Sequence, residues 1–478
     1  MGNLMQGIVR QQFEILKSPL FYLLIISSFL AFSFDYNGGE INTSENYSKL
    51  CANCHGDQTE DFRQRQWVYG NSTNEIFETI KFGYPDDGMP GYFDVLSDQE
   101  ITELAVFLLE ESKKDKIVKK NAYLESSAII RSEDLSFRVE TVIDDLDIPW
   151  GLAFLPNGDM LITEISGRLS RYKDGESLQE IKNVPAVVDR GQGGLLDIEV
   201  HPNFDQNQFI YMSYSKAESK SSRKATTVVE RSRLVDDALI DREIIFEALP
   251  YETTRHHYGS RLEFDKDGYL FFSVGDRGRR DKNPQALDNH CGKIHRIHDD
   301  GSIPEDNPFV NTPGALKSIY SYGHRNPQGV VIDPATGTIW SNEHGPRGGD
   351  EVNIVEKGKN YGWPVISYGI NYSGTKFTDI THKEGMEQPE HYWDPSIGVC
   401  GMAIGSSWRY PQWRGDLFNG SLRFEYLARL KMNGQKIVGE EKLLEDIGRL
   451  RDVKVGRDGY IYVTVEDPGR VLRIVPVE

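Results

Sequence analysis

Two cysteines and a histidine near the start of the chain have the spacing that attaches a haem covalently. Cys51, Cys54 and His55 form the pattern CxxCH within the string CANCH. In this pattern the two thiols add to the vinyl groups of haem, and the adjacent imidazole is held at the iron. A single CxxC without a second pair of ligands nearby argues against zinc or simple dithiol chemistry. The motif therefore predicts a c-type haem and electron transfer.

The residues that follow supply a second iron ligand and a helix behind it. Met89 lies in a Gly-Met-Pro loop, and a thioether ligand raises the potential of haem iron. Ser97 and Glu100 then form a capping box in front of apolar residues at helical spacing. Residues 36–112 thus resemble a single-haem, all-helical cytochrome c domain in which His55 and Met89 bind the iron. A methionine that only packs against neighbours is the alternative.

The N-terminal segment indicates export. Arg10 and Lys17 precede an uncharged, apolar run at residues 18–34. The run is short for a spanning helix and long for the apolar part of a signal peptide, and no clear cleavage site follows it. We expect residues 1–34 to be a signal peptide or an N-terminal membrane anchor. The remainder is then periplasmic or otherwise outside the cytoplasm, soluble or anchored, where c-type haem is attached.

Beyond residue 112 the sequence changes its period. Residues 113–137 begin with a charged stretch and are interpreted as a linker. From residue 138 to 478 one phrase recurs: a short strand, a turn of the Asn-Gly or Asp-Gly type, and a second strand. Its copies lie at residues 151–164, 261–276, 329–346 and 452–467. Each copy predicts an antiparallel hairpin.

Repeated hairpins over about 340 residues predict a six-bladed β-propeller. A pair of β-sandwiches is the alternative, but it does not explain why one phrase recurs. We therefore expect a mainly β protein, in which a small all-α cytochrome c domain precedes the propeller.

Composition and charge exclude some functions. The formal net charge of −19 repels phosphate backbones, so nucleic acid is not expected as a partner. With only four cysteines the chain is not a disulfide scaffold. Cys291 and Cys400 either pair with each other or are buried thiols.

Polar residues gather at corresponding ends of the predicted hairpins, which in a propeller face a common mouth. The strings GQGGLLDI, YGHRNPQG, HGP..GDE.N, NYGWP and R.RDV..G.DG.IYV occur in this order over residues 138–478. In that order they resemble the soluble, propeller-type glucose/sorbosone dehydrogenases that use pyrroloquinoline quinone (PQQ). The resemblance implies a six-bladed propeller with PQQ at its central mouth, and oxidation of an aldose or related sugar or alcohol.

The resemblance also implies roles for individual residues. His257 matches the catalytic base, which takes the hydroxyl proton while hydride passes to the quinone. Arg325 and Asn326 match the pair beside the reactive quinone carbonyl, where a guanidinium stabilises developing negative charge. The other residues matched to PQQ contacts are Gln192, Arg423, Arg449, Arg451 and Asp467.

Calcium is the third implied cofactor, beside haem c and PQQ. The carbonyls of Gly345 and Pro346 match ligands of a calcium ion that grips PQQ, and hard oxygen ligands suit this ion. Glu351 and Tyr361 match a second calcium site. The implied partners are a sugar, polyol or aldehyde-hydrate substrate and a downstream electron acceptor.

Three departures from the family pattern bear on sugar specificity. Arg423 stands where the family often has lysine, His256 stands where some members carry an acid, and Asp281 lies near a position that is glutamine in some members. Arginine at position 423 keeps the positive charge, but its side chain differs from that of lysine in reach and geometry. The reaction type is expected to be intact.

Two other functions compete with a quinone-dependent dehydrogenase. A propeller that only binds a glycan or partner, with the cytochrome as electron carrier, would keep binding without turnover. A calcium-dependent lactonase would need no cationic cradle such as Arg325, Arg449 and Arg451. His290, His295 and His298 resemble a metal cluster on paper, but the pattern favours a strand and its end.

Overall fold

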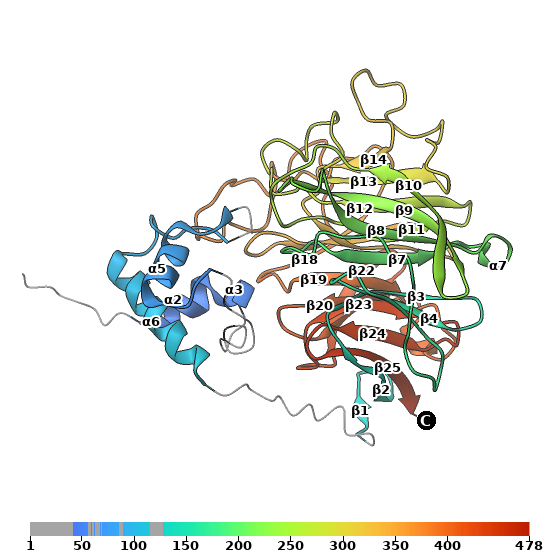
Figure 1. Ribbon diagram of the computed structural model, residues 1–478, viewed down its shortest axis with the longest axis horizontal. Coiled ribbons are helices and arrows are strands. Elements are labelled where there is room, and N and C mark those ends of the chain that lie inside the picture. The colour runs from blue at the N-terminus through green and yellow to red at the C-terminus, as the bar shows by residue number, and fades with distance from the viewer. Residues whose placement is uncertain are drawn as a thin grey trace, which may run out of the picture. The chain divides into compact units, whose positions relative to one another are not determined.

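The computed structural model describes residues 42–55, 59, 62, 67, 69–85, 89–114 and 128–477. The apolar run at residues 18–34 and most of the predicted linker lie outside the described residues. Within the described part, no helix is both long and apolar enough to cross a membrane. The helical N-terminal part and the β part are described separately below (Figure 1).

The N-terminal part is a small helical domain, as predicted. Its helices are α2 (Thr43–Leu50), α3 (Ala52–His55), α5 (Thr73–Phe82) and α6 (Asp98–Ser112). The predicted capping box is present at α6, where Ser97 accepts from the backbone of Glu100 and Glu100 accepts from that of Ser97. The apolar stripe of α6 packs into one core with residues of α2, α3 and α5. Cys51 of the predicted haem motif packs against that core.

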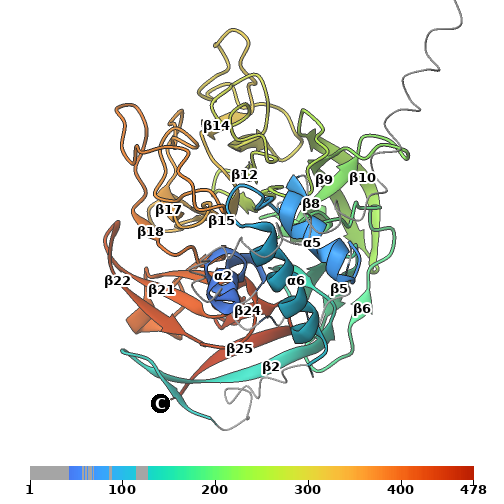
Figure 2. The ribbon, with the colours of Figure 1, turned by 90° about the vertical axis from the view of Figure 1, so that its left-hand side faces the viewer.

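The β part consists of six antiparallel sheets, which confirms the six-bladed propeller (Figure 2). Blade 1 contains β3 (Pro149–Phe154), β4 (Met160–Glu164), β5 (Leu169–Tyr172) and β6 (Gln179–Glu180). Blade 2 contains β7 (Leu195–Val200), β8 (Phe209–Ala217), β9 (Ala225–Val235) and β10 (Ala238–Glu247). Blade 3 contains β11 (Leu262–Phe264), β12 (Tyr269–Val274), β13 (Lys293–His298) and β14 (Ile319–Tyr322). Helix α7 (Phe204–Asn207) joins β7 to β8.

The remaining strands complete the ring. Blade 4 contains β15 (Pro327–Ile332), β16 (Ile339–Glu343), β17 (Asp350–Ile354) and β18 (His391–Trp393). Blade 5 contains β19 (Val399–Ile404), β20 (Leu417–Ser421), β21 (Leu427–Asn433) and β22 (Lys436–Leu443), and the short 3-10 helix η4 (Pro411–Trp413) lies between β19 and β20. Blade 6 contains β23 (Leu450–Val455), β24 (Ile461–Val465), β25 (Gly469–Val477), β2 (Ser136–Leu146) and β1 (Ile130–Arg131).

Blade 6 closes the ring by pairing strands from opposite ends of the β part. Strand β2 pairs antiparallel with β25, from Ser136 opposite Val477 to Leu146 opposite Gly469. The sheet thus begins at Ile130, inside the segment interpreted as linker. A closed ring leaves no blade without a neighbour.

All four recurring phrases form hairpins between the first two strands of a blade. Their turns place Gly158, Gly268, Gly337 and Gly459 at positive φ. Glycine reaches this region without a steric penalty, which explains why the phrase repeats it. The predicted hairpins are confirmed.

Six hydrophobic clusters of the propeller core each lie between two neighbouring blades, and a smaller seventh contains Trp150, Leu196, Ala225 and Tyr258. The first strand of each blade contacts the first strand of the next, so these six strands surround the central axis. They are β3, β7, β11, β15, β19 and β23. The segments that precede them share one mouth of the ring, and the segments that follow them share the other.

Candidate active site

The mouth at which the inner strands begin, here called the catalytic mouth, brings most of the predicted site residues together. The backbone N–H of His257 donates to Gln192 Oε1 at 2.8 Å, which joins blades 2 and 3. The N–H of Gly259 donates to Asn326 Oδ1 at 3.0 Å, which joins blades 3 and 4. Residues far apart in sequence thus meet around the axis, as the predicted common mouth requires.

His257 is held by a carboxylate that sequence reasoning did not single out. Its Nδ1 lies 2.6 Å from Oδ1 of Asp276, and Oδ2 of Asp276 accepts from Trp363 Nε1 at 2.9 Å. Burial alone would raise the pKa of Asp276, but His257 and Arg325 hold it far below its usual range. The ionised carboxylate accepts the Nδ1 proton, so Nε2 of a neutral His257 is left to accept a proton.

The protonation state of His257 follows from its surroundings. Burial is the main cause that lowers its pKa, the charge of Arg325 lowers it further, and Asp276 opposes both.

The backbone of His257 has φ of 58°, in the left-handed region that is uncommon outside glycine. Such strain persists where surrounding contacts fix the residue, and it is frequent at functional sites.

Arg277 and His256 form the surroundings of that strained segment. The fully buried guanidinium of Arg277 donates to the carbonyls of His256 and Thr254 and lies 3.5 Å over the ring of Tyr258. The ring of His256 meets that of His257 edge to face at 4.4 Å. Burial and His257 lower the pKa of His256 well below its ordinary value, so it adds a neutral group beside the base.

Arg325 and Asn326 lie next to the pair of His257 and Asp276. Nη1 of Arg325 donates to the carbonyl of His344 at 3.1 Å, and its guanidinium lies 5.4 Å from the ring of Trp363. The carbonyl of Arg325 accepts from the backbone of Asp276 at 2.7 Å. Arg325 and His257 are therefore both hydrogen-bonded to Asp276.

Backbone irregularities aim further side chains at the axis. Five inner strands have a register shift close to the catalytic mouth, among them β15 between Pro327 and Gly329 and β23 between Leu450 and Asp452. Gln328 and Arg451 occupy these two shifts, and Nη1 of Arg451 donates to Gln328 Oε1 at 3.1 Å. Such bulges redirect side chains next to active sites.

Arg449 and Arg451 converge on one acid. Arg449 Nε donates to Glu466 Oε2 at 2.9 Å, and Arg451 Nε donates to Glu466 Oε1 at 2.6 Å. Burial would raise the pKa of Glu466, but the two arginines lower it to about 2. The predicted acidic contact Asp467 is exposed, so the acid that meets these arginines is its neighbour Glu466.

The charge at the catalytic mouth favours an anionic, planar ligand. Arg423 lies in the same region, where its Nη1 donates to the carbonyl of Ser396 at 3.1 Å. Arg325, Arg423, Arg449 and Arg451 lie around the mouth together with the ionised carboxylates of Asp276 and Glu466. Guanidinium groups bind carboxylates in two-pronged geometry. These residues fit a quinone that carries carboxylates.

The four residues matched to calcium line one small cavity of about 10 Å³, the size of a single water or ion. They are Gly345, Pro346, Glu351 and Tyr361, and Glu343 lines it as well. Burial and the nearby Glu343 raise the pKa of Glu351 to about 8. Two carboxylates and backbone carbonyls at one cavity suit a hard cation such as calcium.

Tyr361 does not offer its hydroxyl to this cavity. The hydroxyl donates to the carbonyl of Ile354 at 2.6 Å and accepts from the backbone of Glu356 at 2.8 Å. Among the described residues, no group of three or more His, Cys, Asp and Glu side chains is arranged to hold a metal ion. Any ion at the cavity would therefore depend on backbone carbonyls.

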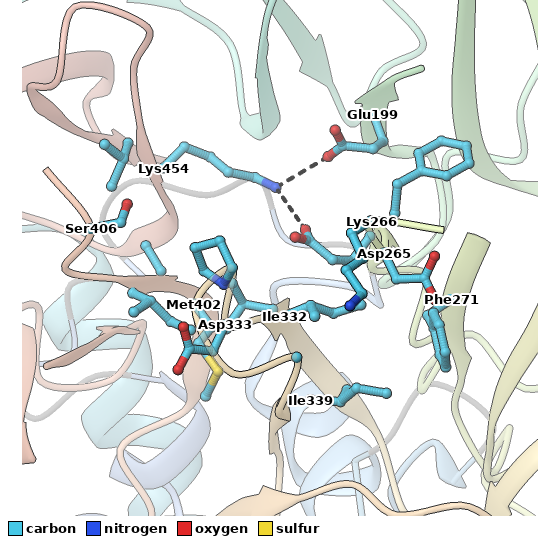
Figure 3. Close-up of a pocket in the computed structure, with 18 of the residues that line it drawn as sticks. Glu199, Asp265, Lys266, Phe271, Ile332, Asp333, Ile339, Met402, Ser406 and Lys454 are labelled. Atoms are coloured by element: carbon cyan, nitrogen blue, oxygen red, sulfur yellow. Dashed lines mark hydrogen bonds and ion pairs between the residues drawn. The ribbon is translucent and has the colours of Figure 1, made fainter. Parts of the chain in front are cut away.

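A larger cavity of about 580 Å³ lies at the opposite mouth of the ring (Figure 3). It is lined by the far ends of the inner strands and the segments after them, including Glu199, Glu263, Ile332, Met402 and Lys454. Lys454 Nζ lies 3.5 Å from Glu199 and 4.0 Å from Glu263. None of the predicted site residues lines this cavity.

A buried ion cluster lies along the axis between the two mouths. Nη1 of Arg261 lies 2.9 Å from Asp197 and 3.0 Å from Asp452, and its guanidinium lies 4.5 Å over the ring of Trp150. The Nε of Arg261 donates to the carbonyl of Gln328 at 3.0 Å. The cluster thus forms the floor beneath the catalytic mouth.

Three of the predicted haem residues, Cys51, His55 and Met89, have described side chains in the helical domain. Cys51 and Met89 both pack against the core of this domain, and the ring of His55 lies 4.9 Å from the ring of Phe62. Cys54 belongs to α3, but its side chain lies outside the described residues. Met89 bonds through its backbone to Tyr84, which fixes the loop that carries it.

Other predictions about single residues have clear outcomes. Cys291 and Cys400 are buried thiols in different blades, so the disulfide alternative is wrong. His295 and His298 lie on β13, as the strand interpretation predicted. Asp281 pairs with Arg280 at 2.9 Å and its side chain is mostly exposed.

Sequence reasoning missed Asp276, Trp363 as its partner, and Glu466. Asp276 ends the hairpin phrase at residues 261–276 and Glu466 directly precedes Asp467. An acid that ends a strand at the catalytic mouth is the signal that both share. This signal can be used only once it is known which mouth of the ring carries the site.

Comparison with protein families matches both parts of the chain. The family described as glucose/sorbosone dehydrogenase matches residues 146–473. The family described as cytochrome c oxidase, cbb3-type, subunit III matches residues 42–108.

Named relatives agree with the first match. The chain is 44% identical over 358 residues to the aldose sugar dehydrogenase YliI of Escherichia coli strain K12, covering 73% of this chain and 96% of that protein. A solved apo form of the soluble E. coli enzyme has 43% identity and a TM-score of 0.69 and covers 71% of this chain and all of its own.

A solved PQQ-bound aldose sugar dehydrogenase of Streptomyces coelicolor has 26% identity and a TM-score of 0.59, covering 71% of this chain and 98% of its own.

Proposed function

Because this chain belongs to the glucose/sorbosone dehydrogenase family and is a PQQ-dependent sugar oxidoreductase with a cytochrome c domain, we propose a complete electron path for it. It oxidises an aldose or a related sugar or alcohol at the catalytic mouth. The electrons leave through a covalent haem c to an external acceptor. The reaction takes place outside the cytoplasm, where such haem is attached.

The observation that carries this proposal is the contact of 2.6 Å between His257 and Asp276 in a mouth rich in arginine. Nε2 of neutral His257 accepts the proton of the substrate hydroxyl. Asp276 stabilises the imidazolium that results, and it orients the ring through Nδ1. PQQ bound at this mouth supplies the acceptor for the hydride that leaves the substrate carbon.

The remaining residues of the mouth hold the cofactor and its ion. Arg449, Arg451 and Arg423 bind carboxylates of PQQ, while Arg325 and Asn326 face its reacting side. Gln192 and Asp467 are further proposed contacts.

Gly345 and Pro346 would provide carbonyls to a calcium ion. Glu351 and Tyr361, matched to a second calcium site, line the same cavity, so the carboxylate of Glu351 and the backbone of Tyr361 would face that ion.

The helical domain provides the exit for electrons. Cys51 and Cys54 would attach the haem, and His55 and Met89 would bind its iron. A haem held there would supply one-electron transfer, so the two electrons of a sugar oxidation would leave one at a time. The downstream partner is then a one-electron acceptor.

The full-length protein, loaded with haem, PQQ and calcium, tests the proposal. On addition of aldoses, the absorption bands of the haem should change to those of the reduced form. The variant His257→Ala should bind PQQ but reduce the haem at least about a hundredfold more slowly. Failure of any aldose, hydroxyketone or alcohol to reduce the haem in PQQ-loaded protein would contradict the proposal. Reduction of an added dye without reduction of the haem would contradict the electron path alone.

A further inference from the structure

His344 lies directly beside the residues assigned to the cofactor, but it has no role so far. It follows β16, and it lines the small cavity next to Gly345. Its backbone N–H donates to the carbonyl of Asn326 at 3.1 Å, and its own carbonyl accepts from Arg325 Nη1 at 3.1 Å. His344 is therefore tied by its backbone to both residues that face the reacting side of the cofactor.

The orientation of the Asn326 side chain follows from its donors. The backbone N–H of Gly259 can only donate, so the atom it contacts at 3.0 Å must be the carbonyl oxygen Oδ1. The amide nitrogen Nδ2 then faces Nδ1 of His344, at 3.2 Å. Nδ2 is only a donor, so Nδ1 of His344 must accept.

This reasoning fixes the tautomer of His344. With Nδ1 as acceptor, the ring proton resides on Nε2. Nε2 is inaccessible to solvent and makes no hydrogen bond to the described residues. The tautomer assignment therefore rests on the contact with Asn326.

We propose that His344 is the positioning residue of the cofactor site: it accepts a hydrogen bond from Asn326 and thereby fixes which face of that amide points to the bound quinone. The inference rests on the proposed function, because Asn326 matters through its contact with PQQ. Without an acceptor at residue 344, the amide can rotate or lose one partner. A group that orients a ligand-binding residue typically contributes about ten- to hundredfold to affinity or rate.

The first experiment needs no cofactor. Selective 15N labelling of histidine in the full-length protein, with His344→Gln to assign the signal, reports the tautomer by NMR. We expect an unprotonated Nδ1 and a protonated Nε2 at neutral pH. A protonated Nδ1 at neutral pH would overturn the proposal.

The second experiment measures PQQ affinity of the calcium-loaded protein by tryptophan fluorescence. We expect His344→Phe, which fills the space without an acceptor, to lose about tenfold in affinity. His344→Gln, whose amide oxygen can accept from Asn326, should recover most of that loss. Equal affinity for wild type and His344→Phe would overturn the inference and leave the proposed function intact, whereas wild-type protein that binds no PQQ would contradict the proposed function itself.

The chain offers a matched control on the same fold. His201 Nδ1 lies 2.9 Å from Nδ2 of Asn207, the same kind of pair, but it follows β7 at the opposite mouth. His201→Phe should cost stability without changing PQQ affinity. An equal loss of PQQ affinity in His201→Phe and His344→Phe would show a general packing effect and would contradict the positioning role.

Discussion

The two mouths of the propeller differ in size, charge and hydrogen bonding. The opposite mouth holds the larger cavity, about 580 Å³, with Lys454 between Glu199 and Glu263. The catalytic mouth holds a cavity of about 10 Å³, but it gathers four arginines and a histidine–carboxylate pair. Cavity size alone would therefore select the wrong mouth. The chemistry is indicated by convergent polar groups that several blades hold in place.

The ion cluster of Arg261, Asp197 and Asp452 separates these regions. Above it lie Arg325, Arg423, Arg449 and Arg451, and below it the cavity is lined by five carboxylates together with Lys266, Arg296, Lys454 and Arg457. A charge difference of this kind allows each mouth to be tested against the other. Variants at one mouth should leave the properties of the other unchanged.

The largest effect is expected for Asp276→Asn. Loss of the carboxylate removes the group that orients His257 and stabilises its protonated form, so kcat should fall about a hundred- to ten-thousandfold. Asp276 acts to raise the pKa of His257, so the variant should also shift the acid limb of the pH–rate profile to lower pH. Steady-state kinetics across pH measures both. Glu199→Gln, a carboxylate at the opposite mouth, should keep the wild-type profile, and a shared loss would contradict the separation of the mouths.

A pair of variants on one strand gives the next effect. Arg451 and Lys454 both lie on β23, but they serve opposite mouths. Arg451→Met removes a carboxylate-binding cation, and we expect about a hundredfold loss of PQQ affinity. Lys454→Met should leave PQQ affinity unchanged but cost about 3 kcal/mol of unfolding free energy, because Glu199 and Glu263 lose their cation. Titration with PQQ and urea unfolding measure the two, and the reverse pattern would refute the assignment.

The smallest effect concerns pH and stability. Burial is the main cause that raises the pKa of Glu263 from 4.5 to about 8. An acid with a raised folded pKa binds its proton more tightly when folded, so its contribution to stability is lost as pH rises from 4.5 towards 8. We expect Glu263→Gln to remove about 1–2 kcal/mol of that loss, less than full linkage because the group is partly solvated. Urea unfolding at pH 5 and pH 8 tests this, and an unchanged difference would contradict it.

Much of the fold follows from the sequence because hairpins are local. A strand, a glycine turn and a second strand lie within about 15 residues, so the phrase shows the blade directly. The pairing of β2 with β25 leaves no such local sign, since its partners are more than 300 residues apart. The same distance explains why the start of β2, together with β1 that pairs with it, fell inside the segment interpreted as linker.

The site residues likewise divide into those that the sequence indicates and those that it does not. Arg325 lies in one of the strings that resemble a known family, His257 was matched by position to the catalytic base of that family, and the structure brings both to one mouth. Asp276 and Glu466 were missed because an acid at a strand end looks like any turn residue until its partners are known. Gln328 and Arg451 meet through backbone bulges, and one extra residue in a strand does not disturb the sequence pattern enough to be recognised.

The closure of blade 6 sets an order of events during synthesis. The CxxCH motif is contiguous and is present once the first 112 residues have been made, whereas Arg449, Arg451 and Glu466 enter with the last blade. Until β25 exists, β2 is an open strand edge that can pair with a second copy of the chain. The two cofactor sites therefore mature in sequence, and slow completion of the ring exposes the protein to strand exchange before its quinone site exists.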